Sequence, residues 1–199
     1  GVKAVVVACN TASALALEGI DCRDTALPVW GVIEPGADRA AAATRNGRVG
    51  VIATESTVSS DAYGSALRRI VPGLEVWSQA CPLLVPLIEE GWLDDPVTAE
   101  VARRYLEPLL AHDIDTLVLG CTHYPLIAPL LARIAGERVV LVDSAPTDSR
   151  ARALVDDRAA SAVLPVPSGF EAAMAGGPAV DLRLSIEEVI KTLAEAMVL

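Results

Sequence analysis

The sequence predicts an α/β fold built on mostly parallel sheets. Its candidate strands, such as residues 2–8 and 116–120, are short and apolar at nearly every position. Continuous apolar runs are typical of strands that are buried on both faces. Segments of helical character follow these runs in alternation, which favours parallel strands joined by helical crossovers. The composition agrees, because 52% of the 199 residues are hydrophobic and only one is Phe, so small aliphatic side chains must build the core.

The predicted elements follow one another along the whole chain. Several helices open with proline near the first helical position, where the missing N–H costs nothing. Ser185 followed by Glu188 fits a capping box for the last helix. We expect strands at residues 2–8, 29–33, 48–53, 116–120 and 139–142. We expect helices at residues 11–18, 35–45, 57–71, 82–90, 96–111, 125–134 and 185–196, and a loop rich in Gly, Ala and Pro at 168–181.

The charge pattern excludes some classes of partner. The formal net charge is −10, and the only lysines are Lys3 and Lys191, so the sequence lacks the basic face of a nucleic-acid-binding protein. No apolar run reaches the roughly 20 residues that a membrane helix needs, and no secretion signal is recognisable. We therefore predict a cytoplasmic protein that binds neither nucleic acid nor membrane. An anionic substrate would need local donors, such as backbone amides at helix N-termini.

The four cysteines are Cys9, Cys22, Cys81 and Cys121. None lies in a CxxC pair, so we predict no zinc site and no redox motif, and the expected thiols are reduced. Residues 4–11 and 116–123 echo each other: a buried strand runs into a small residue, then Cys, then polar residues and a helix. The end of a parallel strand faces the crevice where open α/β sheets bind ligands, and the start of the next helix favours a thiolate.

Two opposed thiols have an obvious chemical use. Inversion of a carbon centre by proton transfer needs a base on one face of the substrate and an acid on the other. Cys9 and Cys121 could fill these roles, with Asn10, Thr11 and neighbouring donors stabilising the developing negative charge. A cysteine after a buried strand is also commonly an inert core residue. The pattern alone leaves both interpretations open, and Cys22 and Cys81 are interpreted as structural.

The segments around these cysteines carry a specific resemblance. ACNTAS at residues 8–13 and GCTHYP at 120–125 resemble the two signature segments of glutamate racemases. GVIEPG at 31–36, GVIAT at 50–54 with Thr57, Ser60 and Tyr63, CPLLVPLIEEG at 81–91 and DSA at 143–145 resemble further segments of that family. The similarity spans roughly residues 1–150, in order and at family spacing, which is more specific than any single motif.

The resemblance implies an isomerase that interconverts L- and D-glutamate without pyridoxal phosphate, metal or nucleotide. Cys9 resembles the thiol that deprotonates D-glutamate, and Cys121 the thiol that deprotonates L-glutamate. Asn10 and Thr11 resemble substrate-binding positions beside the first thiol. The product D-glutamate would supply peptidoglycan synthesis. Glutamate is the expected partner, and a homodimer is compatible with the sequence.

Further roles follow for residues near the second thiol. Thr122 and His123 resemble substrate-binding positions, and His123 is also similar to an auxiliary acid/base residue. Glu89 resembles an assisting carboxylate, although the adjacent Glu90 leaves that register open. Each residue type also has a structural use, since Asn10 and Thr11 could cap a helix and the glutamates could be solvated.

The resemblance implies two doubly wound parallel-sheet domains that face each other across a cleft. Residues 1–32 plus 144–199 would form the first domain and residues 33–143 the second. The chain then crosses between the domains twice, which would place Cys9 on one wall and Cys121 on the other.

The chain departs from the family pattern before Cys9. Family members carry an Asp-Ser pair and a Tyr-Gly pair upstream, and only eight residues precede Cys9 here. We interpret the sequence as lacking the N-terminal segment of the first domain. Because exposed apolar surface and unpaired strand edges promote aggregation, we predict that these 199 residues alone fold poorly or are inactive.

The residues also leave other functions open. The nearest alternative is another two-cysteine racemase, acting on aspartate or hydantoins. A second is a non-catalytic amino-acid-binding remnant of the fold. A third is a cysteine hydrolase, for which Cys121 and His123, only two residues apart, are expected to have poor geometry.

Overall fold

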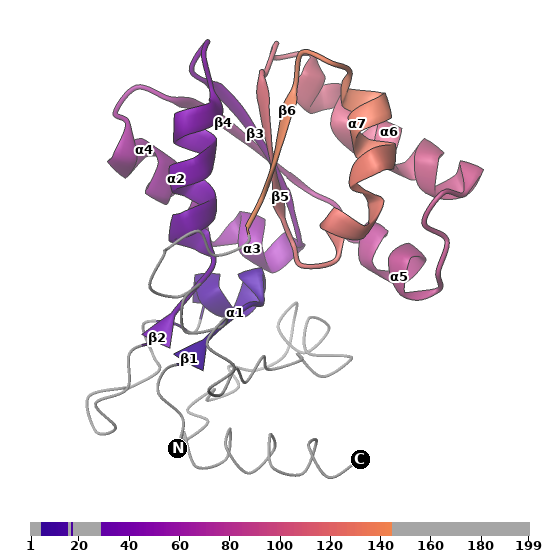
Figure 1. Ribbon diagram of the computed structural model, residues 1–199, viewed down its shortest axis with the longest axis horizontal. Coiled ribbons are helices and arrows are strands. Elements are labelled where there is room, and N and C mark those ends of the chain that lie inside the picture. Colours follow the sequence, from indigo (N-terminus) through magenta and orange to yellow (C-terminus); the bar gives the residue numbers. More distant parts are fainter. Residues whose placement is uncertain (1–4, 16, 18–28, 145–199) are drawn as a thin grey trace, which may run out of the picture.

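The computed structural model describes residues 5–15, 17 and 29–144. Cys22, the predicted loop at 168–181 and the last predicted helix at 185–196 lie outside this part of the chain. The described residues form an α/β structure around a parallel sheet, as predicted (Figure 1). None of the helices in these ranges has the length and apolar character to cross a membrane.

The larger sheet is parallel throughout, with strand order β4-β3-β5-β6. Its strands are β3 (Arg48–Ala53), β4 (Glu75–Ala80), β5 (Thr116–Gly120) and β6 (Val140–Asp143). The two central strands, β3 and β5, are buried along almost their whole length. Their continuous apolar sequence therefore reflects burial on both faces, as the sequence predicted.

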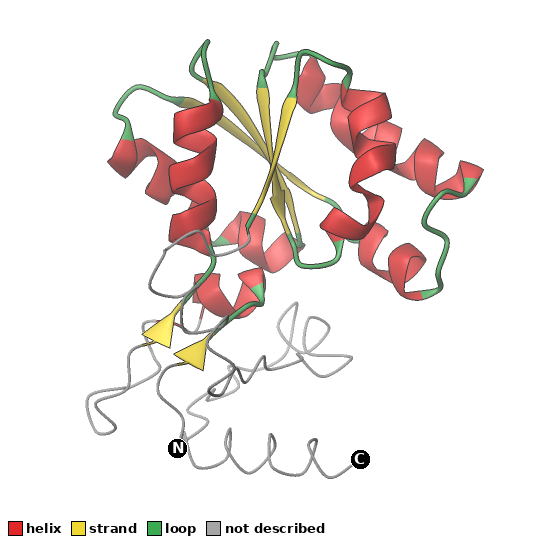
Figure 2. Ribbon diagram, viewed as in Figure 1, coloured by secondary structure: helices red, strands yellow, loops and turns green. Residues whose placement is uncertain are grey.

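Helices cover both faces of this sheet (Figure 2). On one face, α2 (Ile33–Ala43) and α4 (Ala62–Ile70) pack against Val51 and Val118. On the other face, Ile52 and Leu119 pack against α5 (Leu84–Glu89), α6 (Pro96–Leu110) and the segment made of η3 (Tyr124–Ile127) and α7 (Ala128–Ala135). Successive strand residues thus serve opposite cores, because side chains alternate across a sheet.

A second, two-stranded parallel sheet lies beside the carboxyl ends of the larger one (Figure 1). It pairs β1 (Val5–Val6) with β2 (Val29–Trp30), and α1 (Asn10–Leu15) follows β1. The Ser13 hydroxyl joins this helix to both connecting segments, because it donates to the carbonyl of Val7 at 2.8 Å and accepts from the backbone N–H of Val32 at 3.2 Å.

The prediction of one helix over residues 57–71 was wrong. The structure has α3 (Glu55–Ser59), which the Thr54 side chain caps, and then the separate α4. Asp61 divides them because its φ of 51° lies in the left-handed region, which a continuous helix cannot accommodate. Tyr63, in the first turn of α4, is buried.

Strand β4 was missed by the sequence analysis. Its residues EVWSQA are exposed or only partly buried, since β4 lies at the edge of the sheet and pairs only with β3. An edge strand does not need an apolar residue at every position, so the pattern used for the other strands overlooked it. The predicted start of α6 at Pro96 is confirmed, with the Asp95 carboxylate accepting from the N–H of Val97 at 2.7 Å.

Candidate active site

The four residues that directly follow the strands of the larger sheet gather at its carboxyl edge. This edge is where parallel α/β sheets commonly place their binding residues. All four are buried, with side chains suited to polar chemistry, and they come from separate parts of the sequence. They are Thr54 after β3 (3% exposed), Cys81 after β4 (0%), Cys121 after β5 (6%) and Ser144 after β6 (5%).

Helix α1 docks on this edge through hydroxyl groups. The Thr11 Oγ1 atom lies 2.9 Å from that of Thr54 and 3.2 Å from that of Thr57, and the latter two are 3.1 Å apart. All three threonines are buried. This cluster holds the residue two positions after Cys9 against the strand end and helix start of the larger sheet.

Asn10 makes the second connection between α1 and the larger sheet. Its Nδ2 donates to the phenolic oxygen of Tyr63 at 2.7 Å, and its Oδ1 accepts from the hydroxyl of Ser144 at 3.3 Å. Asn10 is itself buried, with 2% of its surface exposed. Asn10 and Thr11 lie inside α1, and both bond to side chains far away in the sequence.

Cys9 directly precedes α1 and is partly exposed. The backbone N–H of Ala12 points to its sulfur at an N–S distance of 3.5 Å, and its carbonyl accepts from Ser13 at 2.9 Å. An N–H donor at the first turn of a helix stabilises negative charge on sulfur. The predicted position of Cys9, between a strand and a helix start, agrees with this geometry.

Cys121 begins a second group of interacting side chains. Its sulfur lies 3.6 Å from Nδ1 of His123, and Nε2 of His123 lies 3.4 Å from Oε1 of Glu89. Cys121 is buried, His123 is partly exposed and Glu89 is exposed. The carboxylate at the end of α5 that contacts His123 thus belongs to Glu89, which the sequence could not distinguish from Glu90.

This geometry corrects one expectation. For a cysteine hydrolase, Cys121 and His123 were expected to form a poor nucleophile–base pair, because they are only two residues apart. The turn at residues 121–123 instead brings the thiol and the imidazole within hydrogen-bonding range for sulfur. Thr122 occupies the middle of that turn and is exposed.

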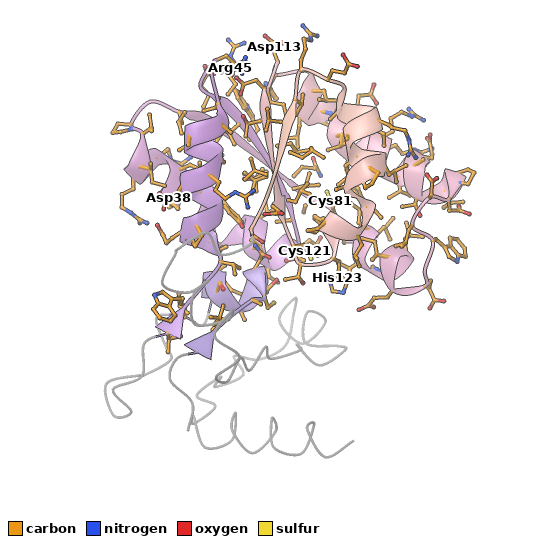
Figure 3. The ribbon with its side chains drawn as sticks, viewed as in Figure 1. Asp38, Arg45, Cys81, Asp113, Cys121 and His123 are labelled. Atoms are coloured by element: carbon orange, nitrogen blue, oxygen red, sulfur yellow. The ribbon has the colours of Figure 1, made fainter. Side chains whose placement is uncertain are left out.

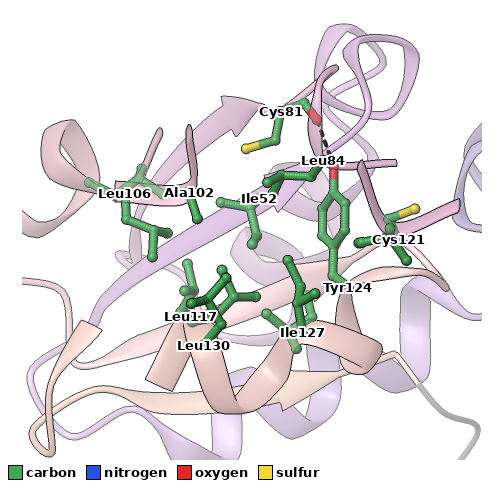
Figure 4. Close-up of a cluster of buried hydrophobic side chains, with 14 of the residues drawn as sticks. Ile52, Cys81, Leu84, Ala102, Leu106, Leu117, Cys121, Tyr124, Ile127 and Leu130 are labelled. Carbon is green, nitrogen blue, oxygen red and sulfur yellow. Dashed lines mark hydrogen bonds between the residues drawn. The ribbon is translucent and has the colours of Figure 1, made fainter. Parts of the chain in front are cut away.

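Cys81 differs from what its sequence context indicated. Because β4 was not predicted, Cys81 was assigned to a helix start, but it follows a strand at the same edge as Cys121. Burial, and secondarily the nearby Cys121, raises the pKa of the Cys81 thiol well above its ordinary value. Its sulfur donates to the carbonyl of Gln79 at 3.5 Å, and its own carbonyl accepts from the Tyr124 hydroxyl at 3.2 Å (Figure 4). Cys81 is therefore a protonated core residue, in agreement with its structural interpretation.

A hollow of about 460 Å³ lies at the other end of the sheet, where the strands begin. Asn46, Asp113 and Asp115 are among the residues that line it. It contains no cysteine or histidine and is remote from Cys121, as Figure 3 shows for Asp113. Within the described ranges, no group of three or more His, Cys, Asp or Glu side chains is arranged to hold a metal ion.

Two residues at the carboxyl edge had no predicted role. Tyr63 and Ser144 were quoted only as parts of resembling segments, yet both contact Asn10. The available signal was the order of the segments: Ser144 follows a strand end, just as Cys121 does. Nothing in the local sequence around Tyr63 reveals that its hydroxyl reaches α1.

Comparison with known proteins agrees with this arrangement. A family model described as Asp/Glu/Hydantoin racemase matches residues 1–148. Over 149 residues the chain is 57% identical to a protein named glutamate racemase from Geobacter metallireducens, and the match covers 75% of this chain and 55% of that protein. The chain spans about half the length of the curated relatives it matches.

Solved structures give the same result. A glutamate racemase isoform from Bacillus anthracis superposes with a TM-score of 0.71 at 39% identity, over 78% of this chain and 58% of that one. The glutamate racemase from Francisella tularensis, solved in complex with D-glutamate, gives a TM-score of 0.70 at 33% identity, over 87% of this chain and 69% of that one.

Proposed function

The chain belongs to the Asp/Glu/Hydantoin racemase family, and on this premise we propose that its protein is an isomerase that interconverts L-glutamate and D-glutamate. The relatives at 48–57% identity are named glutamate racemase, which favours glutamate over aspartate or a hydantoin as the substrate. One observation carries the proposal from family to chemistry. The segment that bears Cys9 is hydrogen-bonded to the sheet edge that bears Cys121.

The proposed reaction is a proton exchange between two thiols. One cysteine, as the thiolate, takes the α-proton of glutamate and becomes a thiol. The electron pair left on the α-carbon delocalises into the carboxylate. The other cysteine then delivers its own proton to the opposite face of the carbon and becomes the thiolate. Nothing is consumed, and the reverse reaction uses the same two groups in exchanged roles.

Each thiol acts as the base in one direction of the reaction. Following the family resemblance, Cys9 deprotonates D-glutamate and Cys121 deprotonates L-glutamate. His123 and Glu89 assist on the Cys121 side. With the Nε2 proton of His123 directed at the Glu89 carboxylate, Nδ1 is the acceptor for the Cys121 proton.

Stabilisation of the developing charge falls to short polar donors. Asn10, Thr11, Thr122 and His123 are the proposed substrate-binding residues. Both Asn10 and Thr11 are buried and held by hydrogen bonds, so their donors are preorganised and lose little freedom during the reaction. Such local donors are needed because the protein carries a formal net charge of −10, which repels an anionic substrate at long range.

Several finer statements belong to the same proposal. The reaction runs without a metal, nucleotide or pyridoxal phosphate, since the thiols perform both proton transfers. The D-glutamate formed supplies peptidoglycan synthesis in the cytoplasm. Residues 1–32 plus 144–199 and residues 33–143 form the two domains that enclose the substrate, and a homodimer stays a prediction that sedimentation can check.

The decisive experiment uses the gene product that contains this chain. Incubated with L-glutamate in D2O, it should produce D-glutamate with deuterium at the α-carbon, while aspartate and 5-substituted hydantoins should remain unchanged. Racemisation of aspartate at the higher rate would identify the alternative racemase. Glutamate binding with no α-deuterium incorporation would identify a non-catalytic binding protein, and hydrolysis of an amide substrate would indicate that Cys121 acts as a nucleophile.

A further inference from the structure

Three buried side chains at the carboxyl edge are joined by two hydrogen bonds that meet at Asn10. Asn10 donates from Nδ2 to the Tyr63 oxygen at 2.7 Å, and Ser144 donates from its hydroxyl to Oδ1 of Asn10 at 3.3 Å. Tyr63 and Ser144 thus hold the two ends of the same carboxamide group.

These two bonds join parts of the chain that are far apart in sequence. Asn10 starts α1, Tyr63 lies in the first turn of α4, and Ser144 follows β6. The bonds from Asn10 span 53 residues to Tyr63 and 134 residues to Ser144. The small sheet and the large sheet are therefore linked at this point by side chains as well as by the connecting backbone.

Tyr63 also touches the segment that carries Cys121. A Cβ atom placed on Gly120 would lie 3.1 Å from the Tyr63 ring, and one placed on Gly36 would lie 3.0 Å from its hydroxyl oxygen. Glycine at both positions lets the tyrosine pack directly against the backbone of β5 and α2. Only 2% of the Tyr63 surface is exposed.

The chemical state of Tyr63 suits a fixed role. Burial raises the pKa of its phenol well above the ordinary value, so the hydroxyl keeps its proton at every working pH. Its oxygen therefore accepts from Asn10 as a neutral phenol. With Nδ2 donating to Tyr63 and Oδ1 accepting from Ser144, the Asn10 amide is held in one orientation, and its second N–H proton is not used in these two bonds.

We propose that Tyr63 is a positioning residue, which together with Ser144 fixes the Asn10 carboxamide and holds the helix after Cys9 in place against the strand that ends at Cys121. The catalytic part of this inference rests on the proposed function, because the fixed Asn10 N–H is then a donor for the substrate carboxylate. The positioning of α1 does not depend on the proposed function. Loss of the bonds from Tyr63 and Ser144 to Asn10 should loosen α1 whatever reaction the protein catalyses.

Three variants of the gene product containing this chain separate these roles. Tyr63→Phe removes the hydroxyl but keeps the ring that packs on Gly120 and Gly36. Ser144→Ala removes the hydroxyl that donates to Asn10. Thr98→Val is the matched control, since Thr98 is fully buried and its hydroxyl donates to the Trp92 carbonyl at 2.6 Å in a different part of the fold.

Two measurements are made on each variant. The first is hydrogen–deuterium exchange of the amides of α1, and the second is the kcat and KM of glutamate racemisation. We expect Tyr63→Phe and Ser144→Ala to speed exchange in α1 and to lower kcat/KM on the order of 10-fold to 100-fold. The double variant should be little worse than the more affected single variant, because either change already frees the same Asn10 carboxamide. Thr98→Val should change neither quantity.

The outcomes are distinct. Normal turnover and normal α1 exchange in Tyr63→Phe would overturn the inference while leaving the racemase proposal intact. If the wild-type protein does not racemise glutamate, the proposed function fails, and exchange in α1 alone then decides the positioning role. Faster exchange would support it, and unchanged exchange would overturn it. If Thr98→Val changes α1 exchange and kcat/KM as much as Tyr63→Phe does, Tyr63 only stabilises the fold and the inference is wrong.

Discussion

Nε2 of His123 lies 3.4 Å from a carboxylate oxygen of Glu89. On its other side the imidazole faces the Cys121 sulfur at 3.6 Å. A carboxylate at the end of α5 is thereby connected, through one imidazole, to the thiol at the end of β5. The Cys9 sulfur instead has a backbone N–H donor, from Ala12. The two thiols therefore have different proton environments, and this difference can be measured.

Substitution of His123 or Glu89 should slow only the proton transfer that uses Cys121. His123→Asn should lower kcat/KM about 100-fold or more, as expected for loss of general acid–base assistance, and Glu89→Gln about 10-fold. The fall must be equal in both directions, because enantiomers have equal free energies and the equilibrium constant is fixed. The asymmetry should appear in isotope effects: α-deuterated L-glutamate should show a larger primary effect than α-deuterated D-glutamate.

The matched control for the His123 and Glu89 variants is Glu90→Gln. Glu90 is the adjacent carboxylate at the end of α5, whereas the His123 contact is made by Glu89. Glu90→Gln should keep the wild-type isotope effects and turnover. Equal isotope effects for both enantiomers in His123→Asn would place the histidine outside the proton path.

Each single thiol should retain exchange with one enantiomer. Cys9→Ser keeps the Cys121 base and should exchange the α-proton of L-glutamate with D2O while losing racemisation by about 100-fold or more. Cys121→Ser should exchange the α-proton of D-glutamate only. Proton NMR of the α-position in D2O measures both, and exchange of both enantiomers by either variant would contradict the division of labour.

Cys81→Ala is the cysteine control. Burial keeps the Cys81 thiol protonated, and its side chain lies in the core. Its removal should leave racemisation in place and lower the free energy of unfolding by about 1–2 kcal/mol through the small cavity created. Loss of turnover beyond the loss of folded protein would show that a third thiol takes part.

The elements that depend on local pattern could be predicted from the sequence. Strands β3 and β5 were found at their observed bounds because burial on both faces forces an apolar residue at nearly every position. Cys9 and Cys121 were found because a strand end and a helix start mark them locally. The edge strand β4 was missed because it is only partly buried and contains Glu, Ser and Gln.

Contacts between distant segments could not be predicted in the same way. The bond from Asn10 to Tyr63 spans 53 residues, and no local periodicity encodes which tyrosine meets which asparagine. The break before α4 also escaped prediction, because a positive φ is uncommon for any residue other than Gly, so Asp61 alone does not mark a break. The assignment of the assisting carboxylate to Glu89 likewise required the orientation of α5 relative to the turn at Cys121.

Removal of metals and carbonyl cofactors should leave the reaction intact. The proposed proton transfers use only side chains of the protein. Dialysis against EDTA and treatment with hydroxylamine, which reacts with pyridoxal phosphate, should therefore not change kcat. Circular dichroism of the glutamate formed provides the assay. Activity that disappears on dialysis and returns with a divalent metal would contradict the two-thiol mechanism.

Asp115 should make stability depend on acid pH. This residue precedes β5, at the end of the sheet away from the cysteines. Its carboxylate accepts from the Thr44 hydroxyl at 2.7 Å and from the backbone N–H groups of Arg45 and Asn46 at 2.7 and 2.8 Å. Partial burial alone would raise the pKa of Asp115, but these bonds, with one from Thr116, outweigh burial and lower it.

The sign of the pH effect follows from that lowered pKa. Because the folded-state pKa of Asp115 lies below the unfolded value of about 3.9, its contribution to stability is complete above that value. It is lost as the pH falls through the folded-state pKa. Urea unfolding of wild type and Asp115→Asn should therefore differ most near neutral pH, and the difference should shrink below about pH 4. Asp94→Asn, which removes an exposed partner of Arg133, should shift the midpoint little at any pH. A wild-type advantage over Asp115→Asn that persists at the lowest pH would contradict this role for the carboxylate charge.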